Sequence, residues 1–306
     1  MNIGILGASR FAKSNIIPSI EGNSNFSLIS IASRRPNEYG QIIDYHSVID
    51  DDSIDIVYIP LPPGKHFEFA RRCLERGKHV IIEKPITLST KETEQLIKLA
   101  KKYNLFIAEN YVFQYHKQWQ KITELIKEFN EPINRVVVDF TFPLIENGQN
   151  FRYDENLGGG GWMDAGAYGL KALLLLGLLP KLESAHVSKR LNNTDIAGVL
   201  NYSFGEIGTS TITYGMSNAY RSEMTIELDS CFIILEKPFS TKPTDNPGLF
   251  ILKNGVRKRV LVDQDNQYVN AFENYFTNIE NSRYSVFYEE IARMDNLRQE
   301  VKHQLV

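Results

Sequence analysis

The segment best suited to chemistry ends a predicted strand with Glu83-Lys84-Pro85. The strand covers residues 79–82, so the lysine falls at the carboxyl edge of a buried sheet, where ligands of such sheets bind. Its ammonium group can polarise or protonate an alcohol or ketone oxygen, and burial brings the pKa of a lysine toward the working range. The alternative is a salt-bridged surface turn, which is the usual environment of a Glu-Lys pair.

The start of the chain offers backbone amides in place of a reactive side chain. A predicted strand over residues 2–6 runs into Gly7-Ala8-Ser9-Arg10-Phe11-Ala12 and then into a helix. In the first turn of a dinucleotide-binding βαβ unit, Gly7 permits the tight turn and a small residue at position 9 lets the backbone approach a pyrophosphate. Ala12 lets the helix pack on the strand, and amides at the helix start face the phosphates. Ser9 replaces the usual middle glycine, and an ordinary strand-turn-helix is the alternative.

Two further loops follow predicted strands of the same sheet. Ser33-Arg34-Arg35 lacks the acidic residue that binds an NAD ribose, and arginine suits the 2′-phosphate of NADP. The alternative is a solvated loop with two surface arginines. Pro60-Leu61-Pro62, with His66 soon after, ends the next strand and fixes a loop at the ligand crevice. These loops predict a cofactor site that prefers NADP over NAD.

The elements that position these segments alternate between strand and helix. Strands are predicted over residues 2–6, 26–32, 54–59, 79–82 and 105–108, and helices over 11–20, 66–76 and 90–103. This rhythm predicts a parallel sheet covered by helices. We therefore expect an α/β chain whose N-terminal Rossmann domain covers residues 1–112.

From residue 113 onward, strand signals follow one another with short turns. Strands are predicted over residues 135–142, 182–191, 196–204, 207–214, 221–228, 231–235, 249–253 and 258–262, and helices over 115–129, 269–281 and 286–306. An insertion over residues 147–180 carries a glycine-rich turn and a buried helix. Residues 113–306 are thus expected to form a C-terminal α+β domain on an open, mostly antiparallel sheet.

Composition argues against several classes of protein. The 306 residues carry a formal net charge of −3, which gives no general attraction to nucleic acid or to anionic membranes. The longest apolar run, residues 170–179, is too short to span a bilayer, and the chain opens on a strand with no signal peptide, so a cytoplasmic protein is expected. Cys73, Cys231 and the histidines show no metal-ligand spacing, so no metal is expected.

Taken in order, these segments resemble the Gfo/Idh/MocA family of NAD(P)-dependent sugar oxidoreductases, and the resemblance spans most of the chain. Its first-domain motifs are residues 4–12, Ala32-Ser33-Arg34, residues 55–62 with His66, and residues 77–80 leading to Glu83-Lys84-Pro85. Ala108-Glu109-Asn110 and Tyr115-His116 resemble the crossover into the second domain. Residues 157–168 resemble the family segment G-G-G-x-x-x-D-x-G-x-Tyr/His.

The resemblance implies roles for three catalytic residues. Lys84 matches the lysine that binds substrate hydroxyls and orients the nicotinamide, Asp164 the aspartate that contacts the substrate or the lysine, and Tyr168 the acid/base position. One helical turn would place Asp164 and Tyr168 on one face, and a phenol near a lysine cation has a lowered pKa. Without the resemblance, Asp164 would be a helix cap and Tyr168 a buried aromatic.

The resemblance also implies the reaction and its ligands. We expect hydride transfer between NADP, NAD being possible, and a ring carbon of a sugar or nucleotide sugar, in a homodimer or homotetramer whose second domain binds substrate. The alternatives are a non-catalytic dinucleotide- or sugar-binding regulator and an NAD-retaining epimerase. Lys117, Arg152 and Lys171 offer cations to a diphosphate, or else are solvated surface charges. Cofactor contacts are expected from Gly7, Ala8, Ser9, Arg10, Phe11, Ala12, Ser33, Arg34, Arg35, Pro60, Leu61, His66, Glu83, Lys84 and Asn110.

The cofactor preference is testable at Arg34. Replacing it in the variant Arg34→Ala should weaken NADPH binding by about 1.5–3 kcal/mol, because a charge-assisted contact to the 2′-phosphate is lost. NADH binding, which has no such phosphate, should stay unchanged. Titration of both cofactors against the wild type and the variant measures this, and equal affinities in the wild type would refute the assignment.

Overall fold

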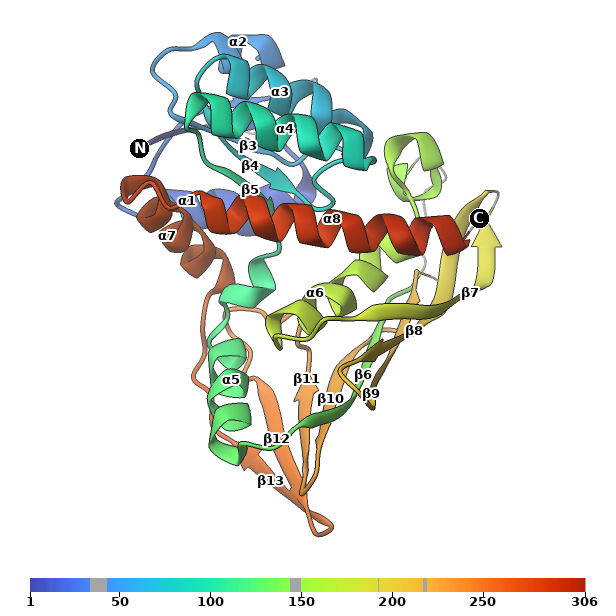
Figure 1. Ribbon diagram of the computed structural model, residues 1–306. Helices are drawn as coiled ribbons and strands as arrows, with labels where there is room; N and C mark the ends of the chain where they lie inside the picture. Colours follow the sequence, from blue (N-terminus) through green and yellow to red (C-terminus); the bar gives the residue numbers. More distant parts are fainter. Residues whose placement is uncertain (34–42, 144–149, 192, 217–218, 306) are drawn as a thin grey trace. The chain divides into compact units, whose positions relative to one another are not determined.

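The structure, a computed structural model, describes residues 1–33, 43–143, 150–191, 193–216 and 219–305 (Figure 1). Contacts divide the chain into two compact units, which are described separately here. The first unit comprises Met1–Tyr111 and Tyr268–Gln299, and the second comprises Val112–Gln267 and Glu300–Val306. The chain therefore returns to the first unit near its end, a feature that the sequence analysis did not foresee.

The first unit is built on a five-stranded sheet in the order β2-β1-β3-β4-β5. Its neighbouring strands all pair in parallel, as predicted. β3 and β5 are buried along their whole length because helices cover both faces of the sheet. The strands are β1 (Asn2–Leu6), β2 (Ser27–Ala32), β3 (Ile56–Ile59), β4 (His79–Glu83) and β5 (Ile107–Asn110). Since β1, β3 and β4 are adjacent, the loops that follow them meet at one edge.

Helices line both sides of this sheet. Figure 1 shows α2, α3 and α4 on one side and α1 and α7 on the other. α4 begins where the Ser89 side chain caps it by accepting a hydrogen bond from the Glu92 amide. α3 ends before Gly77, whose φ of +75° lies in the left-handed region. The helices are α1 (Ile17–Glu21), α2 (Tyr45–Asp50), α3 (His66–Glu75), α4 (Thr90–Tyr103), α7 (Gln267–Glu280) and α8 (Ser285–Leu305).

The second unit is built on an eight-stranded sheet in the order β13-β12-β11-β10-β6-β9-β8-β7. Its pairs are antiparallel except for β6 and β9, which run parallel, so the expected fold class is confirmed. The strands are β6 (Ile133–Thr141), β7 (Lys181–Leu191), β8 (Thr194–Phe204), β9 (Gly208–Gly215), β10 (Arg221–Leu228), β11 (Phe232–Glu236), β12 (Gly248–Lys253) and β13 (Val256–Val260).

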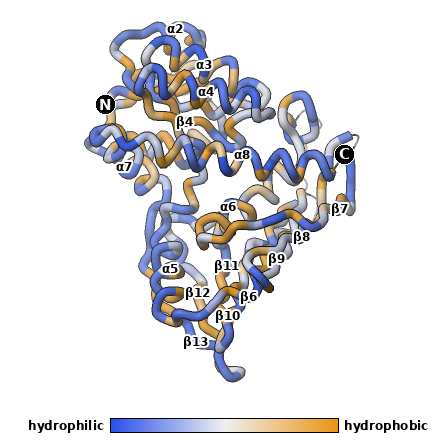
Figure 2. The backbone as a smooth tube through the Cα atoms, viewed as in Figure 1, coloured by the Kyte–Doolittle hydropathy of each residue, from blue (hydrophilic) through white to orange (hydrophobic). Residues whose placement is uncertain are grey.

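Two helices accompany this sheet, α5 (Lys117–Phe129) and α6 (Ala167–Leu175). Figure 2 shows α6 as strongly hydrophobic, and Leu170, Ala172 and Leu173 on it are fully buried. α6 is the buried helix that was predicted within residues 147–180. It continues directly from the glycine-rich turn, so burial of its apolar side chains fixes the position of the residues at its start.

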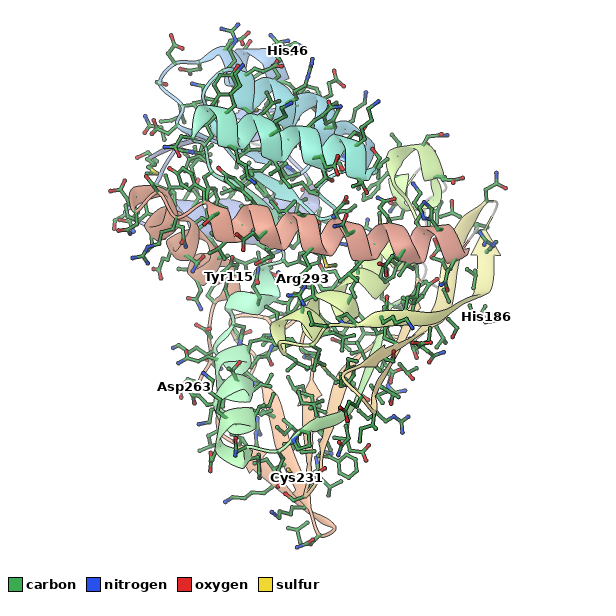
Figure 3. The ribbon with its side chains drawn as sticks, in the orientation of Figure 1. His46, Tyr115, His186, Cys231, Asp263 and Arg293 are labelled. Atoms are coloured by element: carbon green, nitrogen blue, oxygen red, sulfur yellow. The ribbon has the colours of Figure 1, made fainter. Side chains whose placement is uncertain are left out.

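The described residues contain neither a membrane-spanning helix nor a cluster of metal ligands. No helix in that part of the chain combines the length and apolar character needed to cross a bilayer. No group of three or more His, Cys, Asp or Glu side chains is placed there to hold a metal ion. Figure 3 shows His46 on α2 and His186 on β7, in different units.

Candidate active site

The glycine turn after β1 has the geometry that a dinucleotide-binding turn requires. Gly7 adopts a φ of +116°, and a Cβ there would lie 3.1 Å from the Cδ2 atom of Leu61. Its amide donates to the Ala32 carbonyl at 3.0 Å, which joins the ends of β1 and β2. Glycine at position 7 thus allows the ends of three strands to come close together.

Ser9 gives this turn a cap in place of the usual glycine. Its Oγ accepts a hydrogen bond from the Ala12 amide at 3.1 Å. Ala8 and Ser9 are half-buried and Arg10 is exposed, so this turn is open to a ligand. Arg10 and Phe11 begin the helix, and the first amides of a helix have no intrahelical acceptor. The residues present therefore fit a pyrophosphate.

The Glu83 carboxylate is held in place at the end of β4, where the residue is half-buried. It accepts hydrogen bonds from the Tyr58 hydroxyl at 2.7 Å and from Asn110 Nδ2 at 2.6 Å. Tyr275, on α7, in turn donates to Asn110 Oδ1 at 2.9 Å. Burial raises the pKa of Glu83, while the two donors oppose that rise. The side chain just before Lys84 is therefore fixed by a buried polar network, and the predicted cofactor contacts of Glu83 and Asn110 remain predictions.

His66 joins two of the loops that the sequence analysis singled out. Its Nδ1 lies 2.8 Å from the Pro85 carbonyl and its Nε2 lies 2.7 Å from the Leu61 carbonyl. The ring is fully buried, and this burial lowers the pKa of His66 to about 4, although the two carbonyl oxygens favour the protonated form. His66 therefore braces the loops after β3 and β4, and its expected contact with a cofactor remains a prediction.

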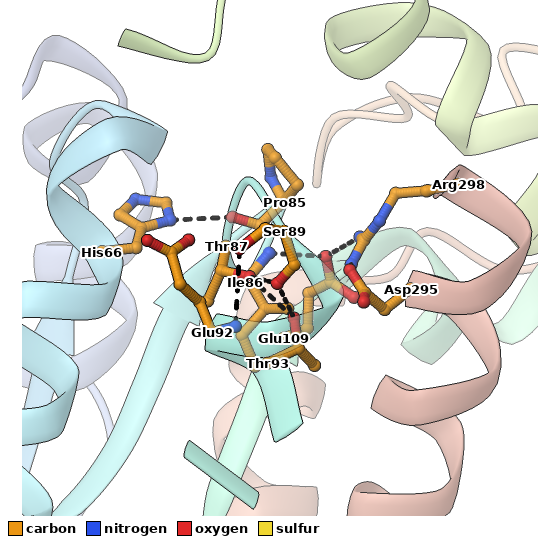
Figure 4. Close-up of polar contacts among 10 residues, drawn as sticks. All are labelled: His66, Pro85, Ile86, Thr87, Ser89, Glu92, Thr93, Glu109, Asp295 and Arg298. Atoms are coloured by element: carbon orange, nitrogen blue, oxygen red, sulfur yellow. Dashed lines mark hydrogen bonds and ion pairs between the residues drawn. The ribbon is translucent and has the colours of Figure 1, made fainter. Parts of the chain in front are cut away.

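His66 contacts the Pro85 carbonyl, and a buried ion pair holds the next backbone group, the Ile86 amide, as Figure 4 shows. The Ile86 amide donates to Glu109 Oε1 at 2.9 Å. The same oxygen accepts a hydrogen bond from Arg298 Nη1 on α8, and the other terminal nitrogen, Nη2, lies 3.3 Å from Asp295 Oδ1. Glu109, Asp295 and Arg298 are all buried, with exposed fractions of 5, 1 and 0 %. The two residues after Lys84 are thus both held by buried side chains: Pro85 by His66, and Ile86 by Glu109.

In the second unit, Asp164 forms an ion pair with Arg152. The Arg152 Nε donates to Asp164 Oδ2 at 2.5 Å. The turn carrying Arg152 lies against the glycine run, since a Cβ on Gly159 would be 2.5 Å from the Arg152 carbonyl oxygen. The glycines therefore have a packing role: they let the arginine reach the carboxylate. The sequence analysis treated these two residues separately.

Tyr168 lies on α6, directly after a π-helical segment over Trp162–Gly166. Its ring contacts those of Phe113, Phe140 and Phe239, with centroids 5.5, 5.1 and 5.7 Å away. The tyrosine is half-buried, so an aromatic cluster orients the ring. A π-helical segment, Ala12–Ile16, also follows the glycine turn, and such segments are frequent at functional sites.

The remaining cations and the histidine named in the sequence analysis differ in how buried they are. Lys171 is 2 % exposed, so a solvated helix position is wrong for it. Lys117 is exposed at the start of α5. His116 is buried, and its Nδ1 accepts from the Gln118 amide at 3.1 Å. Arg34 and Arg35 lie outside the described residues.

The structure groups the predicted site residues by unit. Gly7, Ser9, Ser33, Leu61 and Lys84 follow strands of the first sheet, on one edge. Asp164 lies in the π-helical segment Trp162–Gly166 of the second unit, and Tyr168 lies at the start of α6, which follows it. Sequence reasoning assigned no bracing role to the residues that hold these groups in place, which are Tyr58, Glu109, Arg152, Tyr275, Asp295 and Arg298. No local pattern marks an arginine on α8 as the partner of a glutamate on β5.

Comparisons with known proteins agree with this geometry. The family model described as "Oxidoreductase family, NAD-binding Rossmann fold" matches residues 1–111. The chain is 30% identical over 282 residues to a dTDP-3,4-didehydro-2,6-dideoxy-alpha-D-glucose 3-reductase of Saccharopolyspora spinosa, covering 87% of this chain and 84% of that protein. It is 31% identical over 221 residues to the D-xylose 1-dehydrogenase (NADP(+)) 2 of Haloferax volcanii, covering 67% of each. The chain therefore belongs to the Gfo/Idh/MocA family of oxidoreductases.

A solved structure shows the same fold. KijD10, a 3-ketoreductase from Actinomadura kijaniata crystallised with NADP and TDP-benzene, superposes with a TM-score of 0.94 at 24% identity, covering 100% of this chain and 98% of that one. Variants of that enzyme with one lysine or one tyrosine replaced have also been crystallised with both ligands. At this identity the likeness establishes the fold.

The buried ring of His66 makes stability depend on pH. Burial lowers its pKa to about 4 from 6.5, so the unfolded chain takes up the proton first as the pH falls. His66 therefore stabilises the fold above about pH 6.5, and this contribution is lost toward pH 4. Between about pH 7 and pH 5, the wild type should lose about 2 kcal/mol more stability than His66→Gln. Urea unfolding at both pH values measures this, and equal losses would contradict it.

Proposed function

We propose that this protein is an NADP-dependent ketoreductase or dehydrogenase that transfers a hydride between the nicotinamide and a ring carbon of a nucleotide-linked sugar. The observation that carries the proposal is that the backbone directly after Lys84 is held at the Pro85 carbonyl and the Ile86 amide, on the same sheet edge as a turn that fits a pyrophosphate. The 30% identity to a dTDP-sugar 3-reductase over most of both chains supports the substrate class.

Bound NADPH would supply the hydride, and the chain's residues would bind and orient the reactants. The amides that follow Gly7 hold the pyrophosphate, and Ser33 with the two arginines after it holds the 2′-phosphate. Lys84 stabilises the negative charge that develops on the substrate oxygen. Tyr168 exchanges the proton with that oxygen through its hydroxyl.

In this mechanism, Asp164 would help to position the substrate. Its ion pair with Arg152 holds the carboxylate in one orientation, from which it can contact a substrate hydroxyl. Both side chains are partly exposed, by 15 and 29 %. Arg152 thereby also becomes a candidate for the substrate diphosphate, since a guanidinium presents several donors in one plane.

Two other functions are less consistent with these residues. A non-catalytic regulator on this fold has no need for both Lys84 and Tyr168, and both are present. An epimerase that retains NAD would need an acid at the end of β2, where the chain has Ser33-Arg34-Arg35. Reduction of a nucleotide sugar by NADPH accounts for Lys84, for Tyr168 and for the Ser33-Arg34-Arg35 segment.

We also propose that the protein forms a homodimer or homotetramer through the face of the second sheet that carries alternating charges. β6, β10 and β11 form a shallow hollow there, lined by Arg135, Asp139, Arg221, Glu223, Glu227 and Phe232, among others. Arg221 already pairs with Asp139 and Glu223 at 3.3 and 2.9 Å. A face with both signs of charge can pair with a rotated copy of itself.

The substrate class predicts how binding responds to salt. A dTDP-linked sugar should bind at least about 10-fold more tightly than the same free sugar, because the diphosphate adds charge-assisted contacts. Its affinity should fall as salt rises, whereas that of a free sugar should not. Isothermal titration at low and high salt measures both. Efficient turnover of a free sugar, with no binding of dTDP at about millimolar concentration, would refute the nucleotide-sugar assignment.

The catalytic roles predict the behaviour of two variants. Lys84→Ala and Tyr168→Phe should each lower turnover by roughly 100-fold or more. Phenylalanine keeps the ring among Phe113, Phe140 and Phe239, so only the hydroxyl is lost. Steady-state NADPH oxidation measures the effect.

The matched controls for these variants are Lys65→Ala, whose exposed side chain ends the short helix Pro63–Lys65, and Tyr220→Phe, at an exposed position. Both controls should keep wild-type turnover. If Tyr168→Phe also keeps it, the tyrosine serves packing alone and the proton must reach the substrate another way.

A further inference from the structure

The backbone that follows Lys84 depends on a side chain from the far end of the chain. Glu109 Oε1 accepts hydrogen bonds from both the Ile86 amide and the Arg298 guanidinium (Figure 4). Arg298 comes 189 residues after Glu109 in the sequence. Ile86 is separated from the lysine by Pro85 alone, which has no amide hydrogen. The amide of Ile86 is therefore the first backbone donor that can anchor the turn after the lysine.

Glu109 can hold that amide because its charge is balanced. The carboxylate is 5 % exposed, and a charge this deep needs a partner of opposite sign. Arg298 is fully buried and supplies it. A charged acceptor binds an amide more strongly than a neutral one does. Without Arg298, the carboxylate would either take up a proton or draw in water, and both changes weaken its bond to the Ile86 amide.

Asp295 sets the direction of the guanidinium. It lies one helical turn before Arg298 on α8, and its Oδ1 accepts from Nη2 at 3.3 Å while Nη1 faces Glu109. Arginine is the side chain suited to this task, because its planar fork reaches two carboxylates in a fixed geometry. A lysine would keep the charge but lose the fork.

We propose that Arg298 is a positioning residue for catalysis: through Glu109 and the Ile86 amide, it fixes the turn that carries Lys84. The catalytic part of this inference rests on the proposed function. The structural part, that Arg298 protects the Ile86 amide, does not depend on it. A small displacement of a catalytic group is enough to reduce turnover strongly, so a loosened turn should be measurable.

Hydrogen exchange at the Ile86 amide tests the structural part. In Arg298→Met, this amide should exchange about 10-fold faster or more than in the wild type, because its acceptor is weakened. Arg298→Lys, which keeps the charge, should give an intermediate rate. The matched control is Ile291→Ala, which removes a buried apolar side chain from the same helix and should leave the Ile86 rate within about 2-fold of the wild type once global stability is accounted for. An unchanged rate in Arg298→Met, or an equal increase in the control, would overturn the proposal.

Kinetics test the catalytic part with the same variants. Arg298→Met should lower kcat by about 10- to 100-fold with NADPH affinity within about 3-fold of the wild type, and Arg298→Lys should recover part of the loss. Ile291→Ala should keep wild-type kcat per folded molecule. Wild-type kcat in Arg298→Met would overturn the catalytic part.

A third variant covers the case in which Arg298→Met does not fold. Glu109→Gln keeps an oxygen near the Ile86 amide and removes the charge, so it should shift exchange in the same direction, and an unchanged rate would overturn the proposal. If the wild type turns over no nucleotide sugar, the proposed function fails, and the exchange rates alone decide the role of Arg298.

Discussion

Two carboxylates, the half-buried Glu83 at the end of β4 and the buried Glu109 on β5, determine how the rest of this site is built. A carboxylate deep in a protein is costly unless donors or a counter-charge surround it, and removing one partner of a buried pair costs about 3–5 kcal/mol. Glu83 meets this demand with the neutral donors Tyr58 and Asn110. Glu109 meets it with Arg298 and a backbone amide. The partners of the two carboxylates come from different parts of the chain. Both carboxylates lie next to the turn that carries Lys84.

This arrangement explains why the first unit includes residues from the end of the sequence. Tyr275 on α7 completes the network of Glu83 through Asn110, and Arg298 on α8 completes the pair with Glu109. The aromatic contacts of Phe272 with Phe26 and Tyr58 hold α7 on the sheet. The helices thus give the sheet an apolar cover and at the same time supply the polar partners that its buried acids need.

The sequence predicted local structure well and long-range pairing poorly. The predicted strands correspond to the observed ones, and the helices predicted over residues 66–76 and 90–103 correspond to α3 and α4, because hydrophobic period, glycine and cap residues act over a few positions. The short helix α2 was missed. Partnerships between distant residues, such as Arg152 with Asp164 and His66 with Pro85, leave no mark in local spacing. The burial of Lys171 was missed for the same reason, since a single lysine in an apolar run is consistent with a solvated or a buried side chain.

The central claim, hydride transfer to a nucleotide-linked sugar, has one direct test. The wild-type protein is given NADPH that carries deuterium at the transferable position of nicotinamide C4, together with dTDP-3,4-didehydro-2,6-dideoxy-glucose, the substrate type in the name of its relative. The account predicts that deuterium appears on a ring carbon of the sugar, one atom for each NADPH oxidised. NADPH oxidation with no deuterium on the sugar, or no oxidation with any nucleotide-linked keto sugar, would contradict it.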